Sequence, residues 1–142
     1  MKQRFIVFII AILFFFTSCR HQETYDFMNA VDEIAEISIV ALSFDEEQAL
    51  VETNVQKIVD TNAFLNEFGD IACYTYLGDP AGVTPEGVED TVIKISYTNK
   101  EYELINWNGQ AKCTLERGFI YYSGYHVFDK DQFESFITKY ST

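Results

Sequence analysis

The sequence between residues 91 and 128 constrains the fold more than any other part of the chain. It contains four segments in which apolar and polar residues alternate, separated by short turns. The strongest turn signal is Asn108-Gly109, because both residues accept the positive φ that tight hairpin turns require. Alternation with a period of two predicts half-buried strands. The pattern therefore predicts a four-strand antiparallel meander over residues 91–97, 101–107, 110–116 and 119–128.

Two helices are predicted from apolar residues spaced for one helical face. The first carries Phe64, Leu65 and Phe68. Asp60 or Thr61 can cap its start, and we expect Gly69 to end it in a left-handed conformation. The second is the C-terminal helix, with Phe133, Phe136, Ile137 and Tyr140 at i, i+3, i+4 and i+7. Asp129 caps this helix, and Gln132 stands where a capping-box partner would be.

Three further apolar segments precede the meander. Residues 34–42 are rich in Ile and Val and predict a strand, as do parts of 51–59 and 73–77. With 142 residues, the chain is long enough for one domain. We expect an α+β fold: a single antiparallel sheet, with the four-strand meander toward its C-terminal end and both helices packed on one face.

The N-terminus has a different character. Lys2 and Arg4 precede an uncharged apolar run from Phe5 to Phe16. This run has about 12 residues, whereas a membrane-spanning helix needs about 20. A basic start followed by a short apolar core is typical of a signal peptide. An uncleaved anchor and an ordinary secretory signal are the alternatives.

The end of the apolar run, Phe16-Thr17-Ser18-Cys19, resembles the lipobox of bacterial lipoproteins. The family usually has Leu where this chain has Phe16. The resemblance implies that Cys19 receives a diacylglyceryl group and becomes the mature N-terminus. It divides the chain into a signal peptide (1–18), a lipidated Cys with a short tether (19–30) and a single α+β domain (31–142). We expect a lipid-anchored protein on the outer side of the cell membrane, or on the outer membrane.

The charge of the chain limits the classes of partner. The formal net charge is −12, and the part that follows residue 18 carries −14 because Lys2 and Arg4 lie in the signal. Such a surface repels nucleic acid, so no nucleic-acid partner is expected. The expected partners are the membrane, through the lipid, and an envelope protein or peptide. An inhibitory or immunity-type protein that blocks a basic toxin or hydrolase is an alternative.

Two cysteines remain in the domain once Cys19 is assigned to the lipid. Cys73 and Cys113 both alternate with apolar neighbours, so each is predicted to point toward an apolar face. Outside the cytoplasm such a pair can form a disulfide. Two buried free thiols that behave as small apolar side chains are the other interpretation.

The sequence carries no familiar catalytic, phosphate-binding or metal-binding motif. His126 is the only histidine beyond the tether, and a catalytic base would have to be built around it. We therefore expect neither catalysis nor a metal or cofactor. A small envelope hydrolase that uses His126 is the alternative.

Aromatic residues of the meander suggest a binding surface. They are Trp107, Tyr121, Tyr122 and Tyr125. Exposed Tyr and Trp clusters commonly form binding surfaces, because each side chain combines a large apolar body with a polar tip. The alternative is that these residues pack beneath the helices or against neighbouring strands.

The order of elements is similar to that of small lipoproteins of unknown function from Gram-positive bacteria. The similarity concerns the sequence of strands, the Asp-capped helix, the meander and the Phe-rich final helix. That group implies no activity. The sequence thus predicts a membrane-anchored lipoprotein with a small, non-catalytic extracytoplasmic binding domain.

Overall fold

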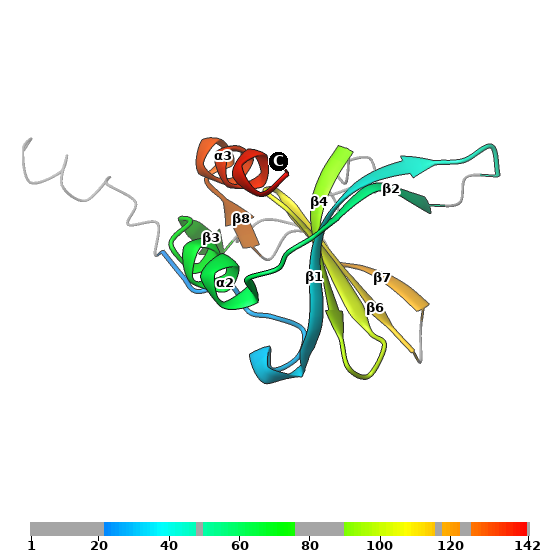
Figure 1. Ribbon diagram of the computed structural model, residues 1–142, viewed down its shortest axis with the longest axis horizontal. Coiled ribbons are helices and arrows are strands. Elements are labelled where there is room, and N and C mark those ends of the chain that lie inside the picture. The colour runs from blue at the N-terminus through cyan, green and yellow to red at the C-terminus, as the bar shows by residue number, and fades with distance from the viewer. Residues whose placement is uncertain (1–21, 48–49, 76–89, 116–117, 123–125, 142) are drawn as a thin grey trace, which may run out of the picture.

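The computed structural model describes residues 22–47, 50–75, 90–115, 118–122 and 126–141. Cys19, Tyr125 and most of the long loop before residue 90 lie outside these residues. Within them, the chain forms a six-stranded antiparallel sheet and a two-stranded sheet, with two α-helices (Figure 1). The prediction of mixed α and β structure is confirmed.

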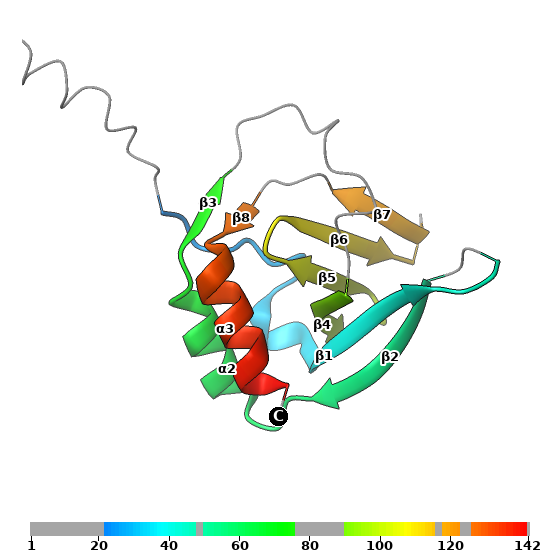
Figure 2. The ribbon, with the colours of Figure 1, turned by 90° about the horizontal axis from the view of Figure 1, so that it is seen from above.

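The six-stranded sheet has the order β2-β1-β4-β5-β6-β7. Its strands are β1 (Ile34–Phe44), β2 (Leu50–Lys57), β4 (Asp90–Tyr97), β5 (Tyr102–Asn106), β6 (Gly109–Thr114) and β7 (Gly118–Tyr122). Each pair of neighbours is antiparallel. The last four strands follow one another in sequence and in space, so the predicted meander is confirmed. In Figure 2 the hairpin of β1 and β2 extends to the right, away from the helices.

The prediction of a single sheet is wrong. The segment expected as one strand over 119–128 contains two strands, because β7 ends at Tyr122 and β8 (His126–Phe128) pairs with β3 (Cys73–Thr75) in a separate sheet. Ser123 and Gly124 interrupt the apolar pattern between them, and glycine inside a strand weakens it. Gln110 of β6 joins the two sheets: its Nε2 donates to the His126 carbonyl (2.8 Å) and its Oε1 accepts from the His126 N–H (3.3 Å).

Both helices begin where the sequence predicts. In α2 (Thr61–Gly69), Asp60 Oδ1 accepts a hydrogen bond from the Ala63 N–H (2.9 Å). In α3 (Lys130–Tyr140), Asp129 Oδ1 accepts from the Gln132 N–H (3.0 Å). Each bond satisfies a backbone donor that the first turn would otherwise leave unpaired.

Two details of the helix ends differ from the expectation. Gly69 is the last residue of α2 and has no left-handed conformation; Asp70 caps the helix with a right-handed φ of −82°. The Gln132 side chain does not close a capping box, because its Oε1 accepts from the Ala72 N–H (2.9 Å). The Asp129 N–H donates to the Ala72 carbonyl (2.8 Å). The start of α3 is therefore fastened to the segment between α2 and β3.

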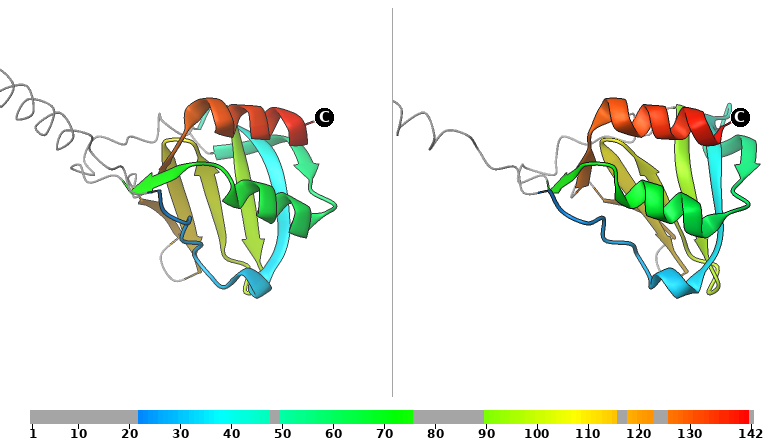
Figure 3. Two further views of the ribbon diagram at one scale, coloured as in Figure 1. Left: turned by 90° about the vertical axis from the view of Figure 1, so that its left-hand side faces the viewer. Right: turned by 60° about the vertical axis from the view of Figure 1, so that its left-hand side comes forward.

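The two helices cover one face of the six-stranded sheet (Figure 3). Their rings meet closely: Phe64 lies 4.7 Å from Phe136 and 4.8 Å from Tyr140, between ring centroids. We call this the helix-facing core, and its strand residues include Ile37, Ile39, Ile93, Ile95, Tyr97 and Ile105. A smaller cluster occupies the opposite face of the sheet, formed by Val40, Leu42, Val92, Leu104 and Ala111.

Two backbone irregularities shape the hairpins. The register places Asn106 opposite Gly109, so the turn is centred on Trp107 and Asn108, one residue earlier than predicted. Between β1 and β2 the register shifts next to Ile39, and on β2 Asn54 has a φ of 51°. Asparagine tolerates this left-handed region better than most residues. The register shift and the left-handed Asn54 together form a β-bulge in β2, which is an edge strand of the six-stranded sheet.

The predicted tether is shorter than expected, because residues 22–30 belong to the folded domain. Tyr25 is 7% exposed and lies in the helix-facing core, with Phe27 and Met28 packed against it. The Glu23 N–H donates to the Cys73 carbonyl (2.8 Å), and Gln22 forms a bridge with Tyr74. We call residues 22–30 the N-terminal strap. A short 3-10 helix, Val31–Glu33, connects it to β1.

Among the described residues, no helix combines the length and apolar character needed to cross a membrane.

Candidate functional site

The most unusual group in the structure is the carboxylate of Glu103, which is 0% exposed. Alternation along β5 places Glu103 on the same face as Ile105, and its register partners are Ile95 on β4 and Lys112 on β6. It therefore lies in the helix-facing core. A buried carboxylate is costly unless it receives hydrogen bonds, so its partners decide what this site can do.

Three donors converge on Glu103. The Tyr25 hydroxyl donates to Oε2 (2.9 Å), and the Met28 N–H donates to Oε1 (3.2 Å). The Tyr97 hydroxyl also donates to Oε1. Hydrogen bonds to an ionised acceptor are stronger than those between neutral groups. This carboxylate thus joins strand β4, strand β5 and the N-terminal strap at one point.

The two tyrosines remain protonated donors across the physiological pH range. Burial raises the pKa of Tyr25 well above its ordinary value, and the Glu103 charge raises it further. Burial also raises the pKa of Tyr97, as does its hydrogen bond to Glu103. Ionisation of either phenol would place a second negative charge beside the carboxylate. Three hydrogen-bond donors, Tyr25, Met28 and Tyr97, therefore surround the Glu103 carboxylate, and we call this arrangement the donor cage.

Sequence reasoning missed Glu103, although a signal was present. The alternation of Glu101, Glu103 and Ile105 in a strand next to Ile93 and Ile95 predicts that Glu103 shares their face. A charged residue on an apolar face is a better indicator of a special site than an apolar one. Tyr25 had no such signal, since no periodic pattern surrounds it.

His126 lies beside this cage. Its ring centroid is 5.2 Å from that of Tyr25. Burial lowers the pKa of His126, while the charges of Asp26 and Glu23 oppose that shift. Its Nδ1 is buried and has no hydrogen-bond partner among the residues that the structure describes. A general base usually has one ring nitrogen oriented by a carboxylate or carbonyl, and within the described part of the chain no such group contacts His126 Nδ1.

The residues predicted as an aromatic binding surface are only partly described. Trp107 is half-buried in the β5–β6 turn and packs against the helix-facing core, and Lys130 Nζ lies 5.4 Å from its ring centroid. Tyr121 and Tyr122 occupy β7 at register positions opposite Ala111 and Gln110, and Tyr125 lies outside the described residues. For Trp107, the structure agrees with the packing interpretation.

Cys73 and Cys113 are both free thiols. Cys73 is buried in the helix-facing core, where burial, followed by the charge of Glu23, raises its pKa to about 11. Cys113 pairs in register with Tyr102, which packs against the cluster on the opposite face of the sheet. Of the two interpretations that the sequence left open, the structure agrees with free thiols, because the sheet separates the two side chains.

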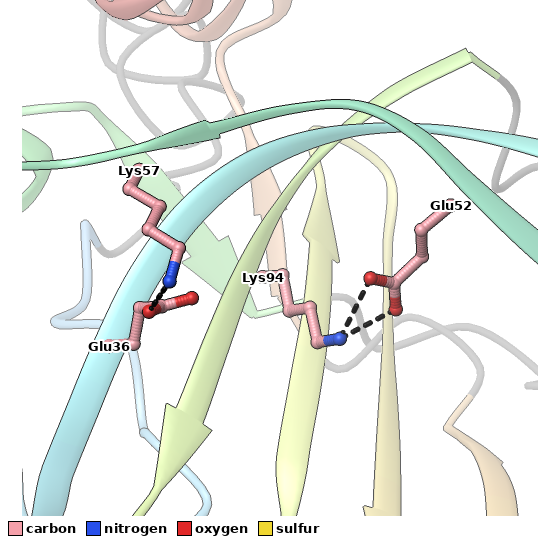
Figure 4. A network of polar contacts seen from close by, with 4 residues as sticks. All are labelled: Glu36, Glu52, Lys57 and Lys94. Atoms are coloured by element: carbon pink, nitrogen blue, oxygen red, sulfur yellow. Dashed lines mark hydrogen bonds and ion pairs between the residues drawn. The ribbon is translucent and has the colours of Figure 1, made fainter.

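The face opposite the helices carries two ion pairs (Figure 4). Lys94 Nζ lies 2.6 Å from Glu52 Oε1, and these side chains are 20% and 31% exposed. Lys57 Nζ lies 2.5 Å from Glu36 Oε2, and these are 69% and 40% exposed. Within the described parts of the chain, no group of three or more His, Cys, Asp or Glu side chains is arranged to hold a metal ion.

Comparisons of the chain with protein-family models, curated proteins and solved structures find no match.

Proposed function

We propose that the protein is a lipid-anchored, non-catalytic binding protein of the cell envelope. Cys19 carries the lipid, and the α+β domain presents an acidic surface to an envelope protein or peptide. The proposal joins the lipobox resemblance of residues 16–19 to the folded domain that follows it.

The position at which the fold begins carries this proposal. Gln22 already contacts Tyr74, and Glu23 is hydrogen-bonded to Cys73. Three extended residues reach about 10 Å, so a lipid on Cys19 would hold the small sheet close to the bilayer surface. Each buried methylene of a lipid chain contributes about 0.8 kcal/mol, and two or more chains give stable attachment.

The surface chemistry supports a basic partner. Exposed carboxylates occur at several separate places in the domain: Asp32 and Glu33 before β1, Asp60 before α2, and Asp131 and Glu134 on α3. An acidic surface accelerates association with a basic partner and disfavours acidic ones. The same charge would keep the domain off anionic headgroups.

The anchor is tested by Cys19→Ala. We expect this variant to lose incorporation of a fatty-acid analogue and to leave the membrane fraction. Cys113→Ala is the matched control, because it removes a domain thiol and leaves Cys19 in place. A Cys19→Ala protein that keeps its size and its membrane association would show that residues 5–16 act as an uncleaved anchor instead.

The proposed binding of a basic partner is tested by reversing the negative charges on α3. Asp131→Lys combined with Glu134→Lys should weaken capture of the envelope partner, and added salt should weaken capture by the unmodified protein. Exposed charges are screened beyond about 8 Å at physiological ionic strength. Capture that is insensitive to both changes would contradict the acidic surface and would favour an aromatic one.

A hydrolase that uses His126 is the second candidate. The observation that favours it is the lowered pKa of His126, which keeps its imidazole neutral and able to accept a proton at pH 7. Hydrolysis of generic ester, peptide or glycan substrates that His126→Ala abolishes would establish this alternative. The same activity retained in His126→Ala would contradict a catalytic role for His126.

A further inference from the structure

The N-terminal strap is held in the fold by a small number of contacts. Tyr25 provides the apolar part: its ring lies 5.7 Å from Phe68 at 77°, and 5.6 Å from Phe128. Phe27 lies 6.1 Å from Phe68. Strap residues thus pack against α2 and β8, which belong to different parts of the fold.

Glu103 provides the buried polar attachment of the strap. Tyr25 donates to one carboxylate oxygen and the Met28 N–H to the other. Two points of the strap, three residues apart, are therefore fixed by the same buried side chain. Other polar links join Asn29 Nδ2 to Glu101 Oε2 (3.3 Å) and the Thr75 hydroxyl to the Glu23 carboxylate.

The rest of the strap is open to solvent. Gln22, Glu23, Thr24 and Asp26 are exposed. Apart from the Gln22–Tyr74 bridge and the Glu23–Cys73 bond, the backbone of the strap does not continue a strand ladder. Terminal segments with few backbone hydrogen bonds open at a lower free energy than the whole domain. The strap has this character, whereas β1 and β4 are paired along their lengths.

We propose that the N-terminal strap is a latch that closes on the Glu103 carboxylate and opens without unfolding the domain. When it is closed, the fold begins at Gln22. When it is open, about nine more residues become free, which adds up to about 30 Å of reach. If Cys19 is anchored as proposed above, the latch sets the distance of the domain from the bilayer. The latch itself does not require the lipid.

The charge of Glu103 closes the latch. Tyr25, Met28 and Tyr97 each donate to it, and an ionised carboxylate is an acceptor at both oxygens. Glu103→Gln keeps the size of the side chain but removes its negative charge and replaces one acceptor oxygen with an NH2 group, which cannot accept the hydrogen bond that Tyr25 donates. It should therefore weaken the attachment of the strap more than it disturbs the packing of the sheet.

Hydrogen exchange measured by mass spectrometry on the full chain in mild detergent tests the latch. Peptides covering residues 22–30 should exchange faster than those of β1 and β4 in the unmodified protein. Glu103→Gln should accelerate strap exchange roughly tenfold to hundredfold, the effect expected for loss of a hydrogen bond to a charged group. The rates of β1 and β4 should change much less. Glu46→Gln is the matched control, since it makes the same chemical change at an exposed side chain between β1 and β2, away from the strap.

Two results would overturn the latch. One is exchange of the strap at the same rate as β4, which would mean that it opens only with the whole domain. The other is unchanged strap exchange in Glu103→Gln. If Glu103→Gln does not fold, Tyr25→Phe removes one donor while keeping the ring, and it should still accelerate strap exchange; an unchanged rate there also overturns the latch. Loss of lipid labelling in Cys19→Ala has no bearing on these rates, so the latch and the anchor can fail independently.

Discussion

The Gln110 side chain pairs with the backbone of His126 as a neighbouring strand would. Its amide donates to the His126 carbonyl at 2.8 Å and accepts from the His126 N–H at 3.3 Å. Gln110 is itself almost fully buried. One side chain therefore replaces a strand pairing between β6 of the large sheet and β8 of the small one.

Gln110→Ala should destabilise the domain by about 1–3 kcal/mol, because two backbone groups of His126 lose their partner. Urea unfolding followed by the fluorescence of Trp107, the only tryptophan, measures this change. Gln22→Ala provides the control, since the same substitution at an exposed side chain should have little effect. Equal stability of the two variants would show that the sheets are held together without Gln110.

Gln132→Ala should cost about 1 kcal/mol, because it removes the acceptor for the Ala72 N–H at the start of α3. Gln132→Glu keeps an acceptor at that position and should retain most of the stability. Thermal unfolding followed by circular dichroism distinguishes the two. If Gln132→Glu were as unstable as Gln132→Ala, the contact with Ala72 would not explain the loss.

Alkaline pH should destabilise the domain through Cys73. Its pKa rises from 9.0 to about 11 in the folded state, so the folded state holds the thiol proton more tightly than the unfolded state. The resulting stability is complete below about pH 9 and is lost as the pH rises through about 11. The contribution of Cys73 should fall by about 1.4 kcal/mol per pH unit in that window.

Cys73→Ala isolates this effect. Unfolding free energies measured from pH 8 to pH 11 should fall less steeply in Cys73→Ala than in the unmodified protein, and the steep dependence should persist in Cys113→Ala. Parallel curves for all three proteins would show that Cys73 is not the group responsible.

The two ion pairs of Figure 4 should differ in strength. A double-mutant cycle with Lys94→Met and Glu52→Gln should give a coupling of about 0.5–1 kcal/mol, because this pair is largely shielded from water. The equivalent cycle for Lys57 and Glu36 should give about 0–0.5 kcal/mol, because both side chains are exposed. A larger coupling energy for Lys57 and Glu36 than for Lys94 and Glu52 would show that burial does not strengthen these ion pairs.

The regular elements could be predicted from the sequence because their patterns are local. Alternation located the meander, and the spacing of Phe133, Phe136 and Ile137 located the final helix. β8 was merged with β7, since a strand of three residues has too short a pattern to be separated. The sequence left both a disulfide and two free thiols open for Cys73 and Cys113, because alternation gives a face within each strand but not which sheet that face belongs to.

The candidate site was predicted only in part. Residue type drew attention to His126 and Trp107, both of which lie near the helix-facing core. The contact between Glu103 and Tyr25 was missed because it joins residues 78 positions apart. No local pattern encodes such a contact. The strap was assigned to a tether for the same reason, since its one fully buried side chain stands among exposed ones.

The β-bulge at Asn54 bears on how molecules of this protein behave when many are crowded together. β2 is an edge strand of the large sheet, and its side chains Val51 and Val55 are exposed. An edge strand that is flat and exposed invites strands from neighbouring molecules and so promotes aggregation. The left-handed Asn54 bends the edge in its middle, which breaks the even row of donors and acceptors that an incoming strand needs. The bulge should therefore disfavour edge-to-edge pairing of β2 with strands of neighbouring molecules at high local concentration.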